Sequence, residues 1–187
     1  MSTAPSSASK PVSSKTSCLL VHPFAPLAVL TLGFGVAAIA TPYAQSLSPT
    51  ALSFRTSNTL IFWLGGSVVS TVLNVVKFKS PTVPRAQLLD VGRHNFAATN
   101  ALEILLASAI TPMLYHDEMT GWWKYTPVMI LAVQTLVKHK LMVRAKELVE
   151  GKEPTGSKAW HAIYSVLELV KMGMLDYVAY QCGKAIA

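Results

Sequence analysis

The sequence predicts an all-α integral membrane bundle of four to five transmembrane helices, with the N-terminus on the inner side of the membrane. Hydrophobic residues make up 51% of the 187 residues, whereas charged residues make up only 13%. An ordinary soluble domain carries about a quarter charged residues. The mean hydropathy of the chain is +0.41, and the length leaves room for one domain.

Apolar segments of about twenty residues or more define the predicted helices, because that length crosses the ~30 Å hydrocarbon core of a bilayer. The predicted helices occupy residues 18–43, 58–78, 95–115, 122–142 and 159–186. Residues 18–187 are therefore expected to form a single membrane-embedded helical domain.

Residues 1–17 are rich in Ser, Ala, Pro and Thr and contain no acidic residue, which is typical of a disordered tail. The alternative is a transit peptide, although the segment lacks Arg and an amphipathic repeat. Residues 18–43 are interpreted as a retained first membrane helix. The alternative is a cleavable signal peptide, because residues 38–40 have the small-x-small pattern of a processing site.

Prolines and polar stretches set the expected helix ends. Pro42 is expected to end the first helix, and Pro112 together with the acidic turn His116-Asp117-Glu118 is expected to end the third, because proline interrupts the hydrogen bonds of a helix interior. Residues 44–57 and 79–92 are interpreted as loops. The fourth helix follows an interfacial aromatic belt and is expected to continue as a surface helix to Glu150.

Two helices carry polar faces. On residues 58–78 the small and polar side chains recur at helical spacing, which favours a helix-packing face; they are Gly66, Ser67, Ser70, Thr71, Asn74 and Lys77. On residues 159–186 one predicted face carries His161, Ser165, Glu168 and Asp176. That last segment is interpreted as a spanning helix with a buried polar stripe, and the alternative is an amphipathic surface helix.

Lysine and arginine alternate between the two ends of the predicted helices. They are abundant in the N-terminal tail, around residues 77–93 and in residues 138–158, whereas the intervening connections contain only Arg55 and Lys124. The positive-inside rule therefore places the N-terminus, the second-to-third connection and the fourth-to-fifth connection on the inner side.

This topology brings the intramembrane polar residues to one depth. Glu103 and Glu168 lie about seven and nine residues into helices that both run outward, or roughly 10–14 Å below the inner interface. Lys171 is the only cation expected at that depth. The candidate site residues are Asn74, Arg93, Asn100, Glu103, Gln134, His161, Glu168 and Lys171.

A carboxylate at membrane depth needs a polar partner, and three interpretations of the candidate site residues follow. They form a structural network that fixes helix packing, a binding or catalytic pocket open to the inner side, or a proton or ion path.

Several functional classes are not expected. The formal net charge of +7 lies in short loops, where it sets topology, so nucleic acid is not an expected partner. The sequence contains no catalytic triad pattern, phosphate-binding glycine loop or dinucleotide fingerprint. The two cysteines and five histidines are too scattered for metal-ligand spacing, so neither a metal nor a cofactor is predicted.

Arg93, Asn100 and Glu103 stand within the stretch RHNFAATNALE, which resembles the Arg-Asn-Glu signature of the MAPEG family. In that family the arginine stands closer to the asparagine. The resemblance implies a four-helix membrane enzyme that uses glutathione on lipophilic substrates.

A second pattern in the C-terminal part is similar to one in small uncharacterised multi-pass membrane proteins. It comprises Arg144, Gly151, Pro154, Ser157, His161, Tyr164, Glu168 and Lys171. It implies no specific activity, and it favours Glu168 and Lys171 as the pair that matters.

The expected function is that of a non-catalytic integral membrane protein with a structural, subunit or assembly role. The alternative is a small membrane enzyme or carrier for a lipophilic ligand, with glutathione as its cofactor. The expected partners are the lipid bilayer and, in an assembly role, other proteins or a homo-oligomer. The expected location is a membrane of the endoplasmic reticulum, another endomembrane or a mitochondrion in a eukaryote.

Overall fold

The computed structural model describes residues 25–79, 81–117, 119, 121–154, 157, 159–184 and 186. Five α-helices make up most of this part of the chain: α1 Ala25–Ser46, α2 Pro49–Val76, α3 Arg85–His116, α4 Thr126–Val149 and α5 Ala159–Lys184. Short 3-10 turns lie at Lys77–Lys79 and Trp122–Tyr125. The described residues contain no strand, as the all-α prediction requires. The predicted disordered tail and residues 18–24 of the predicted first helix lie outside the described residues.

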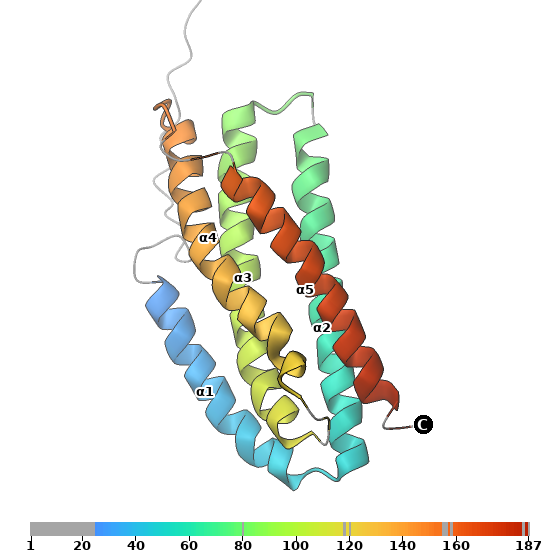
Figure 1. Ribbon diagram of the computed structural model, residues 1–187. Helices are drawn as coiled ribbons and strands as arrows, with labels where there is room; N and C mark the ends of the chain where they lie inside the picture. The colour runs from blue at the N-terminus through green and yellow to red at the C-terminus, as the bar shows by residue number, and fades with distance from the viewer. Residues whose placement is uncertain are drawn as a thin grey trace, which may run out of the picture.

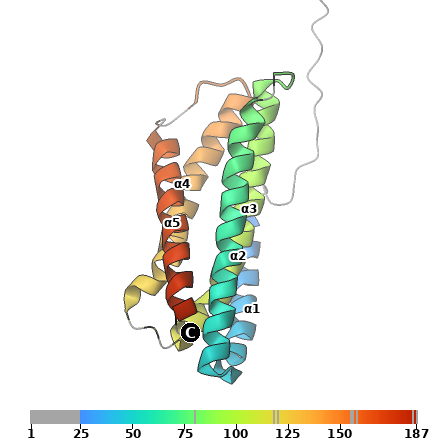
Figure 2. The same cartoon turned by 90° about the vertical axis from the view of Figure 1, so that its right-hand side faces the viewer.

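Four of the helices form a closed ring in which sequence neighbours run antiparallel. Helix α2 packs against α3 and α5, and α4 packs against the same two helices from the other side. Helix α1 lies outside this ring and packs along α3 (Figure 1). Figure 2 shows α1 and α5 on opposite flanks of the bundle. The ring therefore encloses the core, and α1 covers one side of it.

The ring is built from side chains that recur at alternating spacings of three and four residues, as in coiled coils and four-helix bundles. On α5 the buried residues include Tyr164, Glu168, Lys171, Leu175, Val178 and Cys182. On α2 they include Ser53, Thr56, Leu60, Trp63 and Ser67. The polar residues on both helices belong to the same inward-facing rows as the apolar ones, so they are enclosed when the helices pack.

The distribution of polarity is the reverse of that in a soluble protein. Phe34 and Leu136 are 76% and 73% exposed, whereas Lys171 is 0% exposed and Glu103 3%. Within the described residues three helical stretches are long and apolar enough to cross a membrane: Leu27–Ser46, Pro49–Val76 and Arg85–His116. The helical bundle is therefore as predicted, and three of its helices are long and apolar enough to cross a membrane.

Helix α2 begins at Pro49 instead of residue 58, which corrects the predicted loop at residues 44–57. Ser48 is the N-cap, and its hydroxyl accepts a hydrogen bond from the amide of Ala51 at 3.4 Å. Proline suits the first turn because its missing amide hydrogen is not needed there. The connection between α1 and α2 is thus only a tight turn.

Pro42 and Pro112 lie inside helices, so neither proline ends its helix as predicted, although α3 does end at the predicted acidic turn. Helix α1 continues past Pro42 to Ser46, and α3 continues past Pro112 to His116. Each proline follows a threonine whose hydroxyl donates to the carbonyl oxygen four residues earlier, at 2.8 Å for Thr41 and 2.7 Å for Thr111. Such side-chain bonds and packing by neighbouring helices make proline tolerable in membrane helices.

Three further boundaries differ from the prediction. Helix α3 begins at Arg85, directly after Pro84; residues 85–92 are therefore helical although they were predicted as part of a loop. The predicted start of the fourth helix at residue 122 is a 3-10 turn, and α4 begins at Thr126. Helix α4 extends to Val149, as expected. Helix α5 ends at Lys184, two residues before the predicted end at residue 186.

Candidate functional site

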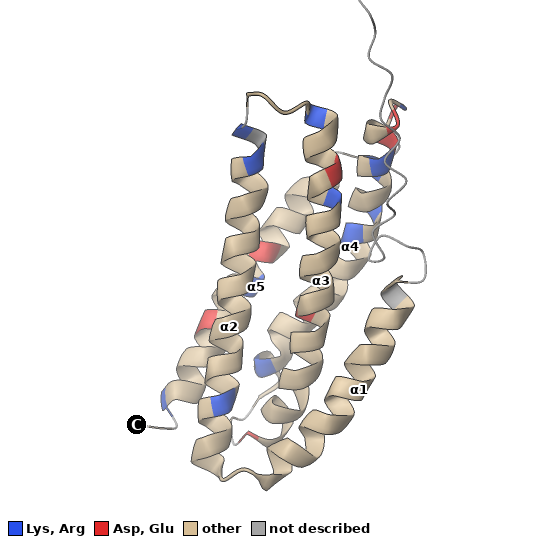
Figure 3. Ribbon diagram, turned by 180° about the vertical axis from the view of Figure 1, so that it is seen from behind, with Lys and Arg blue, Asp and Glu red and all other residues tan. Residues whose placement is uncertain are grey.

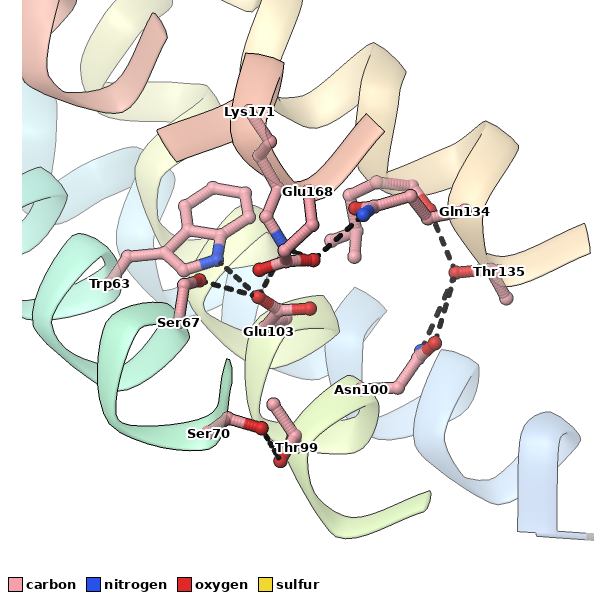
Figure 4. Close-up of polar contacts among 11 residues, drawn as sticks. Trp63, Ser67, Ser70, Thr99, Asn100, Glu103, Gln134, Thr135, Glu168 and Lys171 are labelled. Atoms are coloured by element: carbon pink, nitrogen blue, oxygen red, sulfur yellow. Dashed lines mark hydrogen bonds and ion pairs between the residues drawn. The ribbon is translucent and has the colours of Figure 1, made fainter. Parts of the chain in front are cut away.

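Lys171 lies at the centre of a buried charged cluster inside the ring (Figure 4). Helix α5 directs its ammonium group toward two carboxylates at once. The Lys171 Nζ donates to Glu103 Oε1 at 2.5 Å and to Glu168 Oε2 at 3.1 Å. The Glu103 bond joins α5 to α3, whereas the Glu168 bond lies one turn away within α5. A single cation thus serves two acids in a region closed to solvent.

Glu103 is held from a third helix as well. From α2, the Ser67 hydroxyl donates to Glu103 Oε1 at 2.8 Å, and the Trp63 indole nitrogen donates to the same oxygen at 3.2 Å. With Lys171, three donors converge on one carboxylate oxygen. This arrangement satisfies a buried anion well, because hydrogen bonds to a charged group are among the stronger ones in proteins.

Glu168 is held from α4. The Gln134 Nε2 donates to Glu168 Oε2 at 2.7 Å, whereas the Gln134 Oε1 is a buried acceptor without a hydrogen-bond partner among the described residues. Every helix of the ring therefore contributes a side chain to the cluster. With its groups ionised, the unit of two carboxylates and one ammonium carries a net charge of −1.

Two smaller polar contacts flank the cluster. Asn100 of α3 and Thr135 of α4 are joined through the Asn100 Nδ2 at 3.4 Å, and Thr135 also donates to the carbonyl of Leu131 in its own helix. The hydroxyls of Ser70 on α2 and Thr99 on α3 lie 3.1 Å apart. These contacts tie α3 to α4 and to α2 about one turn before Glu103 along α3, below Glu103 in Figure 4.

Half of the eight predicted site residues meet directly: Glu103, Gln134, Glu168 and Lys171. Asn100 lies beside them but bonds to Thr135. Asn74 lies further along α2 and accepts from Lys77 at 2.7 Å and from Asn95 at 3.3 Å. The polar face predicted on this helix does pack against α3, through Ser67 and Ser70.

Arg93 and His161 do not join the cluster. Arg93 forms an ion pair with Asp90 at 2.7 Å, one turn earlier on α3. His161 is exposed near the start of α5, as is Ser165, and Asp176 is exposed further along. The predicted polar stripe of this helix was therefore wrong except for Glu168, because the buried row passes through Tyr164 and Leu175 instead.

Residues of the site that the predicted set did not include are Trp63 and Ser67 at Glu103, and Ser70, Thr99 and Thr135 in the flanking contacts. Ser67 and Ser70 had been assigned to a helix-packing face. Trp63 was regarded only as part of an apolar segment, although it lies four residues before Ser67 in the row that faces inward. That row, with its three- and four-residue spacing, is the signal in the sequence that could have identified it.

An apolar groove of about 370 Å³ runs between α1, α3 and α4. Ile104 and Ser108 of α3 and Leu131 and Ala132 of α4 line it, and Leu30 closes its α1 side. The groove reaches the residue next to Glu103 but not Glu103 itself. The charged cluster is therefore enclosed by packed side chains, and the groove is a separate feature.

Cations gather at the end of the bundle that holds the α2–α3 and α4–α5 connections (Figure 3). In the described residues they are Lys77, Lys79, Arg85, Arg93, Lys138, Lys140, Arg144, Lys146 and Lys152, and the acids there are Asp90, Glu147, Glu150 and Glu153. We call this region the basic end.

At the basic end, α3 and α4 bring cations to the same carboxylate. A hydrogen bond from Lys152 lowers the pKa of the exposed Glu150 below its ordinary value, and the charges of Lys152, Lys146 and Arg93 add to this effect. Arg93 of α3 and Lys146 of α4 therefore both lie close enough to Glu150 for their charges to act on it.

No family model matches the chain, and no curated protein or solved structure matches it either. Among the described residues, no group of three His, Cys, Asp or Glu side chains could hold a metal ion. The fold and the site together define a class: an α-helical bundle with an apolar exterior, three helices able to span a membrane and a charged cluster sealed at its centre.

Proposed function

We propose that this chain is a multi-pass integral membrane protein with a structural, subunit or assembly role and no catalytic activity of its own. The observation that carries the proposal is the enclosure of the charged cluster. Glu103 is 3% exposed, and its Oε1 already accepts three hydrogen bonds from Trp63, Ser67 and Lys171. An active site must leave room for a substrate beside its reactive groups, whereas here packed protein side chains fill that space.

In this proposal all five helices cross the membrane with the N-terminus inside. Helices α4 and α5 carry more charge than the other three. Glu168 and Lys171 of α5 face into the ring, where a polar partner replaces water, whereas Asp176 is exposed nearer the C-terminal end of α5. The basic end is then the inner side, because positive loops stay there. The exposed aromatic residues Tyr115 and Trp122 lie at the opposite end and fit the outer interface.

The alternative of a glutathione-dependent enzyme receives less support from the geometry. The resemblance that implies it requires Arg93, Asn100 and Glu103 to act together. Arg93 instead pairs with Asp90, Asn100 with Thr135, and Glu103 with Lys171. Three separate sets of partners do not form one anion-binding site.

Accessibility of the cluster tests the proposal. In a background with Cys18 and Cys182 changed to Ala, Ser67→Cys places a thiol of similar size beside Glu103. We expect this thiol to resist a small water-soluble methanethiosulfonate reagent in the detergent-solubilised protein, because the cluster is enclosed. Val83→Cys, in the exposed α2–α3 connection, is the reactive control. If the thiol at position 67 reacted as fast as the thiol at position 83, the cluster would not be enclosed, and the result would favour a pocket.

A further inference from the structure

The groove between α1, α3 and α4 presents a hydrocarbon surface even though three hydroxyl groups lie along it. Ser108, Thr111 and Thr135 each donate to the carbonyl oxygen four residues earlier in their own helix, at 2.7–2.9 Å. No hydroxyl donor is therefore left over for a polar ligand at this level. At membrane depth such a groove is complementary to an alkyl chain and not to a headgroup.

Helical periodicity leads from this groove to the basic end on both of its long walls. On α4, His139 lies four residues after Thr135, and Lys146 follows seven residues later on the same face. On α3, Arg93 lies eleven residues, or about three turns, before Ile104. One turn above the groove the α4 wall thus becomes polar, and further up both walls carry cations. The described part of α1 begins beside the middle of α4 (Figure 1), below these residues.

The contact between Asn100 of α3 and Thr135 of α4 sets the level of the cations on α4. His139 lies four residues beyond Thr135, and Phe96, where the apolar run of α3 begins, lies four residues before Asn100. Both therefore lie about 6 Å from that contact, at ~1.5 Å per residue. His139 and its neighbours thus lie at the level where α3 leaves the hydrocarbon. Cationic groups at that level favour an anionic partner that the membrane itself can supply.

From the groove and the rim above it, we propose that this face of the protein binds one anionic glycerophospholipid. Its acyl chain occupies the α1–α3–α4 groove, and its phosphate lies at a rim formed by His139, Lys146 and Arg93. This proposal rests on the proposed integral membrane character of the chain. Asp90 and Glu150 border the rim, but the described residues of the basic end hold nine lysines and arginines against four acids, so the rim stays complementary to a phosphate.

The test is native mass spectrometry of the full chain, delipidated in mild detergent and titrated with phosphatidylglycerol or phosphatidylcholine of identical acyl chains. We expect one phosphatidylglycerol to bind at least about tenfold more tightly than phosphatidylcholine. Lys146→Gln should weaken phosphatidylglycerol about fivefold, because one Lys near an anionic surface contributes ~1 kcal/mol. The matched control Lys184→Gln, at the opposite end, should leave its binding unchanged.

A second pair of variants tests the groove. Ala132→Phe fills the groove from an exposed position of α4, so we expect it to abolish phosphatidylglycerol binding without lowering the melting temperature. Ala132→Leu should weaken binding by a smaller factor, and Val69→Phe, on the exposed apolar face of α2, should have no effect.

Three results would overturn the proposal. Equal binding of the two lipids excludes headgroup recognition, and full binding by Ala132→Phe shows that surface charge alone holds the lipid. A dimer that Ala132→Phe dissociates shows that a second copy of the chain fills the groove. None of these results bears on the enclosure of the charged cluster, which the Ser67→Cys labelling tests separately. Release of the protein from membranes by alkaline carbonate would instead refute the integral membrane character.

Discussion

Replacing Lys171 by methionine removes the cation that bonds both carboxylates of the buried cluster while keeping a side chain of similar length. Lys171 is 0% exposed and pairs with both Glu103 and Glu168, so the variant leaves two enclosed carboxylates without a bonded counter-ion, and Lys138 acts on Glu103 only through its charge. Breaking a buried pair in this way costs ~3–5 kcal/mol. We expect the lower end of that range, about 3 kcal/mol, because polar groups of a membrane protein also find partners in the unfolded state.

The charge balance predicts a distinctive order among the single variants. Glu168→Gln leaves a neutral Lys171–Glu103 pair that keeps its donors from α2, so its effect on the free energy of unfolding should be small. Glu103→Gln should cost more, because it also weakens the bonds from Trp63 and Ser67. Lys171→Met should be the most damaging of the three changes.

The readout is the melting temperature of the detergent-solubilised protein. For a chain of this size 1 kcal/mol shifts the melting temperature by roughly 2–4 °C, so Lys171→Met should lower it by about 6–12 °C. Combining Lys171→Met with Glu103→Gln or Glu168→Gln should give a smaller loss than the sum of the singles, because each second change removes one uncompensated charge. If the decreases in melting temperature simply add in both combinations, the three charges do not interact, and that result would refute the charged cluster.

Two further predictions concern topology and helix packing. Membrane-impermeant reagents should label Val83→Cys and Glu153→Cys from one side of the membrane and Trp122→Cys from the other; labelling of the first two from opposite sides would refute the proposed orientation. Gly33→Ala should lower the melting temperature by roughly 2–6 °C through overpacking, because its new Cβ would lie 2.7 Å from the Ser108 hydroxyl oxygen. Ser108→Ala should restore most of that loss, and a failure to do so would show that α1 does not approach α3 at this point.

The predicted helices were located correctly, but their ends were not. Apolar runs of about twenty residues predicted five helices, and the structure has five in the described residues. Pro42 misled the prediction because a helix can continue past a proline, and α1 runs on to Ser46; α3 likewise continues past Pro112 and ends at His116, one residue beyond the predicted end. Residues 49–57 were assigned to a loop for their polarity, yet Ser53 and Thr56 are buried in the ring.

The sequence by itself determined the level of each polar residue along its helix, because an α-helix rises a constant ~1.5 Å per residue. That regularity predicted that Asn100, Glu103, Gln134, Glu168 and Lys171 lie close to one level. Asn74 was expected there too, but it lies beside Asn95, about two turns from Glu103. Only the tertiary structure decided which side of each helix faces inward. The rotation of a helix about its axis depends on all its neighbours at once. Successive side chains point about 100° apart around that axis, so an error of one residue assigns the wrong face. For this reason Trp63 lies in the cluster and His161 does not.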